Sequence, residues 1–390
     1  MAIKKQSLFV AAYLLLLSSS FINAQGDAED VEVPKNEAWL KQVNLASVPD
    51  IAVRPVGSGI CENVDCDGPE NDRCFETCGN TPTPADIYGC PKDHSWALTF
   101  DDGPSQYTDK LLDILDEHNI KATFCVMGSH VEKYPHIVKR AYEAGHHIAS
   151  HTYSHPHLMS LTNEEIIYEM KATEKAIEDA IGIKPKYARP PFGEADGRVK
   201  ALLKSMGYKV LLWNVDPTDY DVYMRADASK KIRGAFKSAA AGIDTGLNPH
   251  EDPGFISLQH DLYNQSIAQV PHIIDYLTHL GYSFLTAAEC LDDHEPHELL
   301  NGALEAQNAA NNTSPIVDAS STSSPTGSPS SDPSSSPSSS PSSTNKNNNT
   351  TERNQKQNTH VSGATTTESY SLTRLFVSAL GTLALTPFFL

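Results

Sequence analysis

The sequence predicts an α/β fold that closes into a (β/α) barrel with fewer strands than the eight-stranded form. Two observations support this prediction. About seven short apolar runs alternate with amphipathic segments of helical spacing, which is typical of parallel strands joined by right-handed crossovers. Polar and charged residues directly follow several of the runs, and the active groups of such barrels lie at the carboxyl ends of the strands.

Each predicted strand is an apolar run between polar segments. The first run, Trp-Ala-Leu-Thr-Phe, ends at two adjacent carboxylates, and the third is followed by a pair of histidines. The expected strands cover 96–100, 122–127, 147–150, 187–189, 210–213, 254–258 and 283–285.

Helices are expected between these strands. In the first of them, Leu111, Leu112 and Leu115 face one way. A capping-box sequence at 162–165 precedes a segment whose apolar residues recur with helical spacing up to residue 181. The later helices are expected at 197–206, 226–241 and 266–280.

The amino end of the 390-residue chain is predicted to be a secretory signal peptide over 1–24. Lys4 and Lys5 precede a short apolar stretch, and a segment of small and polar residues ends at Ala24. An uncleaved anchor is the alternative, but the apolar stretch is too short to span a membrane.

The carboxyl end resembles a signal for attachment of a glycosylphosphatidylinositol (GPI) anchor. Small residues at 362–364 precede a polar spacer at 365–374 and an apolar end at 375–390. Ser362 is the predicted attachment site, and 363–390 would be removed. A tail-anchored transmembrane helix is the alternative, which the shortness of the apolar segment and Pro387 disfavour.

The segment 293–362 is predicted to be an extended stalk. It is rich in Ser, Pro, Thr and Asn, a composition that cannot bury a core and that is typical of O-glycosylated stalks in secreted chains. The remaining chain divides into a Cys-rich extension at 25–91 and a barrel domain at 92–292. Acceptor sequences for N-glycosylation stand at Asn264, Asn311, Asn312, Asn348 and Asn349.

Six of the seven cysteines are disulfide candidates, because the signal peptide implies an oxidising route. The four in the extension suggest two local disulfides, and zinc binding by these thiols is the disfavoured alternative. Cys90 precedes the first barrel strand and Cys290 follows the last, so these two could pair if the barrel closes on itself. Cys125 is expected to be a buried free thiol. The cysteines of the extension are Cys61, Cys66, Cys74 and Cys78.

The formal net charge of −19 argues against nucleic acid as a partner, because no basic patch is present to neutralise phosphates. The charge is expected to serve solubility. A monomer is expected.

Two clusters predict a metal site. Asp101 and Asp102 follow the first strand, and their side chains should point in opposite directions. His151 and His155 follow the third strand with a spacing that places both imidazoles on one face of a helical turn. One carboxylate and two imidazoles with open positions suit a catalytic divalent metal, and the second carboxylate can act as base toward the attacking water. The neighbouring histidines His146, His147 and His157 are interpreted as structural or as residues that support the metal ligands.

Further polar residues follow the later strands. Arg189 begins a rigid Pro-Pro loop and can hold an acid ionised, while Phe192 in that loop retains a backbone N–H that can stabilise an oxyanion. Trp213 offers an aromatic wall, and two acids follow it at Asp216 and Asp219. His260 stands at the end of a later strand, and a histidine paired with an acid could protonate a leaving amine.

These five clusters resemble, in order, the motifs of the polysaccharide deacetylases with the NodB homology domain, carbohydrate esterase family 4. The resemblance covers about 92–290 and includes Ala122-Thr123-Phe124 and Gly145-His146-His147-Ile148. It implies a distorted (β/α)7 barrel.

The resemblance also implies roles for single residues. Asp101 resembles the general base and Arg189 its tether; Asp219 resembles the acid that tunes His260, the general acid. The implied metal ligands are Asp102, His151 and His155. Trp213 and Leu258 resemble walls of the acetyl pocket, while Tyr220 stands where many relatives have Trp and Phe192 where many have Tyr.

The implied reaction is removal of N-acetyl groups from N-acetylglucosamine units, with one Zn²⁺ or Co²⁺ as cofactor. Related folds act on chitin, peptidoglycan or acetylxylan. The predicted anchor implies a eukaryote and the stalk resembles those of fungal wall proteins, so chitin is the expected substrate. The expected location is the plasma membrane and the cell wall, with release to the medium. Acetylxylan esterase and a catalytically silent wall-binding protein are the alternatives.

Overall fold

The computed structural model describes residues 31–64, 66, 71–243 and 252–300. Several predicted features lie outside these residues. They are the signal peptide, Ser362 and its tail, the stalk beyond residue 300, and the glycosylation sites other than Asn264. Among the helices of the described residues, none has the length and apolar character needed to cross a membrane.

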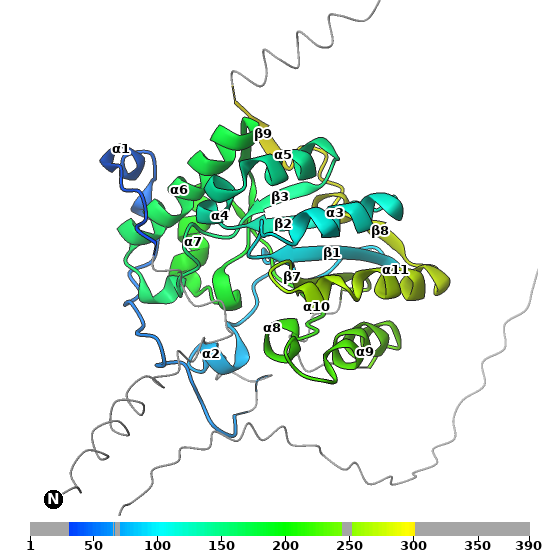
Figure 1. Cartoon of the computed structure of the whole chain (residues 1–390). Coiled ribbons are helices and arrows are strands. Elements are labelled where there is room, and N and C mark those ends of the chain that lie inside the picture. Colours follow the sequence, from blue (N-terminus) through cyan, green and yellow to red (C-terminus); the bar gives the residue numbers. More distant parts are fainter. Residues whose placement is uncertain (1–30, 65, 67–70, 244–251, 301–390) are drawn as a thin grey trace, which may run out of the picture. The chain divides into compact units, whose positions relative to one another are not determined.

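A parallel sheet of seven strands lies at the centre of the described part (Figure 1). The strand order is β6-β5-β3-β2-β1-β7, and β8 pairs with the first half of β1. The predicted distorted (β/α)7 barrel is thereby confirmed. The strands are β1 (Ser95–Asp101), β2 (Thr123–Val126), β3 (His147–Ser150), β5 (Tyr187–Ala188), β6 (Lys209–Val210), β7 (Phe255–His260) and β8 (Ser283–Leu285).

The side of the barrel between β6 and β7 is irregular. There, Val215 forms a single parallel bridge to Ser257 of β7. The strand predicted at 210–213 ends at Val210, and Leu211 forms a single parallel bridge to Ile87 of the extension. The carbonyl groups of Leu211 and Leu212 accept hydrogen bonds from the Arg189 side chain. The backbone after β6 thus pairs with the extension and also holds the Arg189 side chain.

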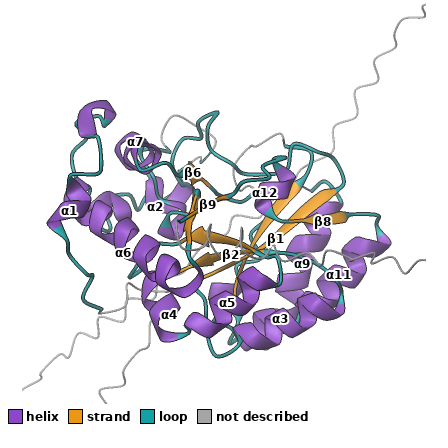
Figure 2. Ribbon diagram, turned by 90° about the horizontal axis from the view of Figure 1, so that it is seen from above, coloured by secondary structure: helices purple, strands orange, loops and turns teal. Residues whose placement is uncertain are grey.

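Helices cover the outside of the sheet, and Figure 2 shows α3, α4, α5 and α11 on one side of it and α12 on the other. The helix predicted at 266–280 is divided into α10 and α11, because Pro271 lacks the N–H that a continuous helix needs. The helices are α3 (Thr108–Glu117), α4 (Gly128–Lys133), α5 (Pro135–Glu143), α6 (Asn163–Ile181), α7 (Gly197–Ser205), α8 (Asp219–Val222), α9 (Ala228–Ala240), α10 (Asn264–Ile267), α11 (Val270–His279) and α12 (Ala287–Cys290).

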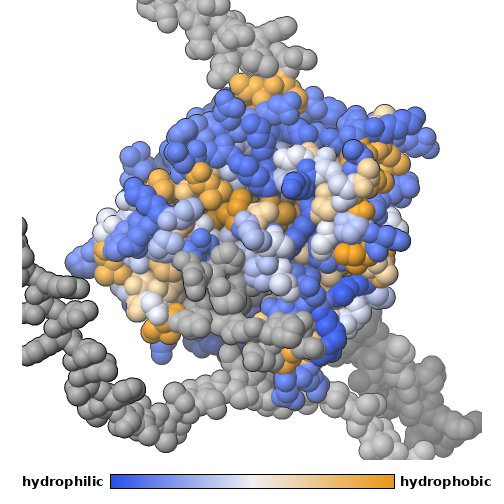
Figure 3. All heavy atoms as spheres, turned by 180° about the vertical axis from the view of Figure 1, so that it is seen from behind, coloured by the Kyte–Doolittle hydropathy of each residue, from blue (hydrophilic) through white to orange (hydrophobic). Residues whose placement is uncertain are grey.

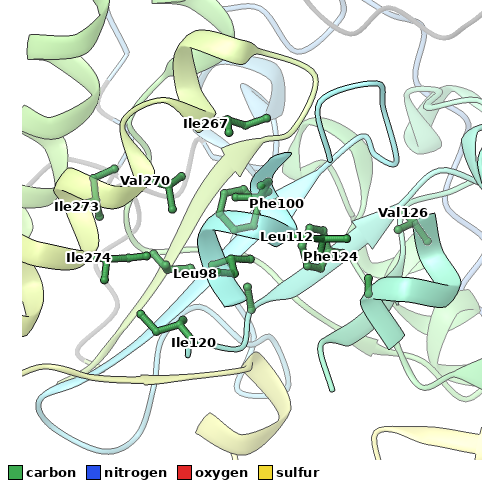
Figure 4. Packing of buried hydrophobic residues seen from close by; sticks show 14 of the residues in the cluster. Leu98, Phe100, Leu112, Ile120, Phe124, Val126, Ile267, Val270, Ile273 and Ile274 are labelled. Atoms are coloured by element: carbon green, nitrogen blue, oxygen red, sulfur yellow. The ribbon is translucent and has the colours of Figure 1, made fainter. Parts of the chain in front are cut away.

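Side chains of β1 alternate between two cores. Leu98 and Phe100 pack against Phe124 and the outer helices (Figure 4), whereas Ala97 belongs to a second cluster with Cys125 inside the barrel. Because neighbours on a strand point to opposite faces, Asp101 shares the inner face with Ala97. Cys125 is a buried free thiol, as predicted.

The Cys-rich extension packs on the barrel through Val43, Phe75 and Tyr88, which join a cluster with residues of α6 and α7. It contains the short helices α1 (Glu37–Leu40) and α2 (Phe75–Cys78). The predicted disulfide bonds are present, as Cys61–Cys74, Cys66–Cys78 and Cys90–Cys290.

The surface of the molecule is mostly polar on the side that Figure 3 shows. Hydrophilic residues cover much of this face, with smaller hydrophobic groups between them.

One antiparallel pair, β4 (Ile183–Pro185) and β9 (His297–Leu299), was not predicted. Because β9 lies within 293–362, the first residues of the predicted stalk are folded. The Nε2 atom of His297 lies 3.0 Å from the Ile148 carbonyl oxygen of β3, and this contact helps to hold β9 against the barrel.

Candidate metal centre

The carboxyl ends of β1, β3 and β7 bring the predicted reactive side chains together. Asp101, the last residue of β1, pairs in register with His260, the last residue of β7. Asp102 follows with a φ of 72°, in the left-handed region. With this change in backbone conformation, the two adjacent carboxylates do not point in opposite directions, as the strand pattern predicted. Both face Nε2 of His151, at 3.7 Å from Asp101 Oδ2 and 3.2 Å from Asp102 Oδ1.

Asp102, His151 and His155 form the metal-ligand group found among the described residues, with donor atoms within 4.8 Å of one another. The Asp102 Oδ1 atom lies 3.2 Å from Nε2 of His151 and 3.4 Å from Nε2 of His155. Ligands of tetrahedral zinc stand roughly 3.3 Å apart. Because all three residues are buried and Asp102 Oδ1 has no hydrogen-bond partner, the group fits a divalent metal.

Neighbouring groups orient these side chains. The Nδ1 atom of His151 lies 2.7 Å from the Arg189 carbonyl oxygen, a contact that places the proton on Nδ1 and leaves Nε2 as the ligand atom. Burial alone would raise the pKa of the Asp102 carboxyl, but His155 and His151 lower it below its usual range.

His130 is a site residue that the sequence analysis missed. Its Nδ1 atom lies 2.6 Å from the Asp102 carbonyl oxygen. The residue stands in α4, directly after β2, so its position after a strand was the signal that could have found it.

The helical turn predicted for the histidine pair is wrong. Thr152 and His155 have φ values of 68° and 59°, and an α-helical turn requires negative φ. The imidazoles of His151 and His155 instead converge from an irregular loop, with ring centroids 4.9 Å apart.

Asp101 is held by a buried arginine. One guanidinium nitrogen of Arg189, Nη1, donates to Asp101 Oδ1 at 2.6 Å and to Thr99 Oγ1 at 2.7 Å, and Nη2 donates to the Leu212 carbonyl at 2.9 Å. The second Asp101 oxygen lies 3.7 Å from His151 Nε2. Asp101 therefore faces the metal-ligand group with one oxygen tethered.

His260 is paired with Asp219 beneath it. The Nδ1 atom of His260 lies 2.7 Å from Asp219 Oδ1, and its backbone N–H donates to Oδ2 at 2.8 Å. The Ser266 hydroxyl also donates to Oδ2, at 2.5 Å, and receives a bond from Gln259 Nε2. Burial alone would lower the pKa of His260, but the Asp219 carboxylate raises it to about 10.

Two of the predicted substrate-binding residues contact the proposed base tether and acid. The Trp213 ring lies 5.4 Å from the Arg189 guanidinium, and Leu258 is buried in β7, two residues before His260. The Tyr220 ring meets His260 edge-on at 5.4 Å. Their roles toward substrate remain predictions.

Phe192 lies in a short 3-10 turn, Pro191–Gly193, with a φ of 59°. Its ring stacks on His157 at 3.9 Å and meets the edge of His155 at 4.7 Å. Because His157 pairs with Glu194 at 2.9 Å, it lies outside the metal-ligand group. The backbone N–H of Phe192 remains the predicted oxyanion donor.

The barrel, with an Asp-His-His group at its carboxyl face, defines the class of NodB-type deacetylase domains, and comparisons with known proteins agree. The family model described as polysaccharide deacetylase matches residues 88–211. Chitin deacetylase 1 of Cryptococcus neoformans var. grubii is 38% identical over 264 residues, which cover 65% of this chain and 55% of that protein. The peptidoglycan-N-acetylglucosamine deacetylase of Bacillus cereus is 36% identical over 191 residues, 48% of this chain and 67% of the relative.

Among solved structures, the chitin deacetylase from the fungal pathogen Colletotrichum lindemuthianum matches with a TM-score of 0.50 and 30% identity, over 56% of this chain and 97% of its own. The chain belongs to the polysaccharide deacetylase family. It spans 55% of the length of the cryptococcal relative.

Proposed function

We propose that this protein is a metal-dependent chitin deacetylase, which hydrolyses the N-acetyl groups of N-acetylglucosamine units and gives chitosan and acetate. One observation carries the proposal. Asp101, tethered by Arg189, faces the metal-ligand group, and His260, paired with Asp219, approaches the same group with its Nε2 atom 4.0 Å from Asp102 Oδ2. A base and an acid thus flank one point.

Each flanking residue supports one proton transfer. Asp101 accepts the proton that the attacking water loses as its oxygen bonds to the amide carbon, and Arg189 holds this carboxylate in place. The N–H of Phe192 donates to the developing oxyanion. His260 then protonates the amide nitrogen, the C–N bond breaks, and acetate leaves. A divalent ion held by Asp102 and the two histidines would supply polarisation of the amide carbonyl and acidification of the water.

Chitin is the favoured substrate. Two of the similar proteins are named as chitin deacetylases, and the predicted anchor and stalk suit a fungal wall protein. One relative is named for peptidoglycan, so the test includes that polymer. Zn²⁺ and Co²⁺ both suit the ligand set.

Acetate release would be measured on a chitin pentamer, on peptidoglycan and on acetylxylan. We expect release from the pentamer, loss of release after chelation, and recovery on addition of Zn²⁺ or Co²⁺. Release from acetylxylan alone would point to an esterase. No release from any polymer by folded, metal-loaded protein would point to a wall-binding protein instead.

We further propose that the chain is GPI-anchored through Ser362 at the outer plasma membrane. The order of small residues, polar spacer and apolar end supports this. Phosphatidylinositol-specific phospholipase C should release the protein from membranes. An intact 375–390 segment on the mature protein, found by mass spectrometry, would contradict the anchor but not the deacetylase.

A further inference from the structure

A buried carboxylate holds the loop between the two histidine ligands. Glu169 lies on α6 and is 3% exposed. Its Oε2 atom accepts hydrogen bonds from the backbone N–H groups of Tyr153 and Ser154, at 2.8 and 2.9 Å. Its Oε1 atom accepts the Ser154 hydroxyl at 2.6 Å. One side chain therefore satisfies three donors in the segment that separates His151 from His155.

The carbonyl groups of the same segment are paired with α4. The N–H groups of Gly128 and Ser129 donate to the carbonyls of Thr152 and Tyr153, at 2.9 and 3.1 Å. A Cβ atom at Gly128 would stand 2.5 Å from the Tyr153 ring, so this close approach requires glycine. The loop is thus clamped by α4 and α6 together.

This clamp explains why the histidine pair is not helical. A left-handed backbone at Thr152 and His155 is unfavourable for these residue types and persists only where surrounding contacts impose it. The contacts that impose it here come from Glu169 and from the first residues of α4. A change in the backbone at residues 153–154 would move His155 relative to His151.

We propose that Glu169 is a positioning residue for the metal centre, which sets the relative placement of His151 and His155 by holding the backbone between them. This inference rests on the metal site of the proposed function. A carboxylate suits the role because it only accepts hydrogen bonds and meets only donors. Glutamine can keep the two backbone bonds but turns its own N–H₂ toward the Ser154 hydroxyl.

The test is metal affinity of the full-length protein, stripped with a chelator and titrated with Zn²⁺ in competition with an indicator. Co²⁺ absorption would report the ligand geometry. We expect Glu169→Gln to weaken Zn²⁺ binding roughly tenfold and Glu169→Ala to weaken it up to about 100-fold, the range found when residues supporting metal ligands are lost. The cobalt spectrum should change in both.

Two control variants separate positioning from general stability. Glu178→Gln makes the same chemical change at an exposed position of α6, and it should leave affinity and spectrum unaltered. Ile177→Val removes a buried methyl group from the same helix; it should lower the melting temperature of the metal-free protein while affinity stays the same.

Unaltered affinity and spectrum in folded Glu169→Gln and Glu169→Ala would overturn the inference. If Glu169→Ala does not fold, Glu169→Gln and Ser154→Ala provide the test, because each disturbs the clamp more mildly. Wild-type metal affinity in both of these variants would overturn the inference. If the wild-type protein binds neither ion, the proposed function falls together with this inference.

Discussion

The adjacent carboxylates at the end of β1 both face His151, but each has a further partner of its own. Asp101 continues the strand and meets a guanidinium, whereas Asp102 has a positive φ and meets two imidazoles. A single change at either position should therefore affect one function and spare the other.

Asp101→Asn should lose most turnover while metal binding is retained. The amide cannot take up the proton of the attacking water, and loss of a general base costs roughly two to four decades of rate. Acetate release and metal content of the same preparation would be measured. Near-normal turnover of a folded Asp101→Asn protein would refute the assignment of the base.

Asp219→Asn should shift the basic limb of the pH–rate profile toward lower pH. The Asp219 charge raises the pKa of His260 to about 10. The acid works while His260 is protonated and fails as pH rises through that pKa, so a lowered pKa brings the loss to lower pH. An unmoved basic limb would separate Asp219 from His260.

Ser266→Ala should lower kcat roughly tenfold or more, because a bond to a buried charged group contributes about 1.5–3 kcal/mol. The Ser266 hydroxyl holds Asp219 beneath His260, yet it is also the third residue of the Asn264 glycosylation sequence. Asn264→Gln is the matched control, since it removes that sequence and keeps the hydroxyl. An equal loss in both variants would assign the effect to the glycan.

At the scale of elements, local sequence predicted the strands well. The predictions for β3 and β8 match the structure residue for residue, because each is a compact apolar run. The pairing of β4 with β9 could not be predicted, since each strand is three residues long and its partner lies far along the chain.

The site was predictable where it depended on position after a strand, and not where it depended on distant contacts. Asp101, His151 and His260 follow that rule. The conformation of the histidine loop does not, because Glu169 and α4 impose it from elsewhere. A signal was nevertheless present, since Glu169 is an acid at helical spacing among the apolar residues of α6.

The first turn of α6 is fixed by a capping box. The Thr162 hydroxyl accepts the Glu165 N–H at 3.3 Å, and the Glu165 carboxylate accepts the Thr162 N–H at 2.8 Å. Thr162→Ala should lower the free energy of unfolding by about 1 kcal/mol in urea titration, and Thr162→Ser should not. Equal stability of all three proteins would show that packing alone fixes this helix.

For the whole molecule, the Cys90–Cys290 bond ties the entry of the barrel to its exit across 200 residues. Replacement of both cysteines by serine should lower the free energy of unfolding by about 2–5 kcal/mol, because the unfolded chain regains the entropy of a long open loop. Urea titration would measure this. A loss below 1 kcal/mol would show that the barrel restrains its own ends without the bond.

Because the two ends of the barrel lie next to each other, the arrangement of its strands in space does not depend on where the chain begins and ends. The Cα atoms of Cys90 and Cys290 are 5.3 Å apart, less than the length of two peptide steps. A short linker could therefore join the two positions covalently, and new ends could be opened at the exposed turn of Gly207 between α7 and β6. Such a circularly permuted chain would keep every neighbour in the sheet and would present Asp101, His151 and His260 at the same rim.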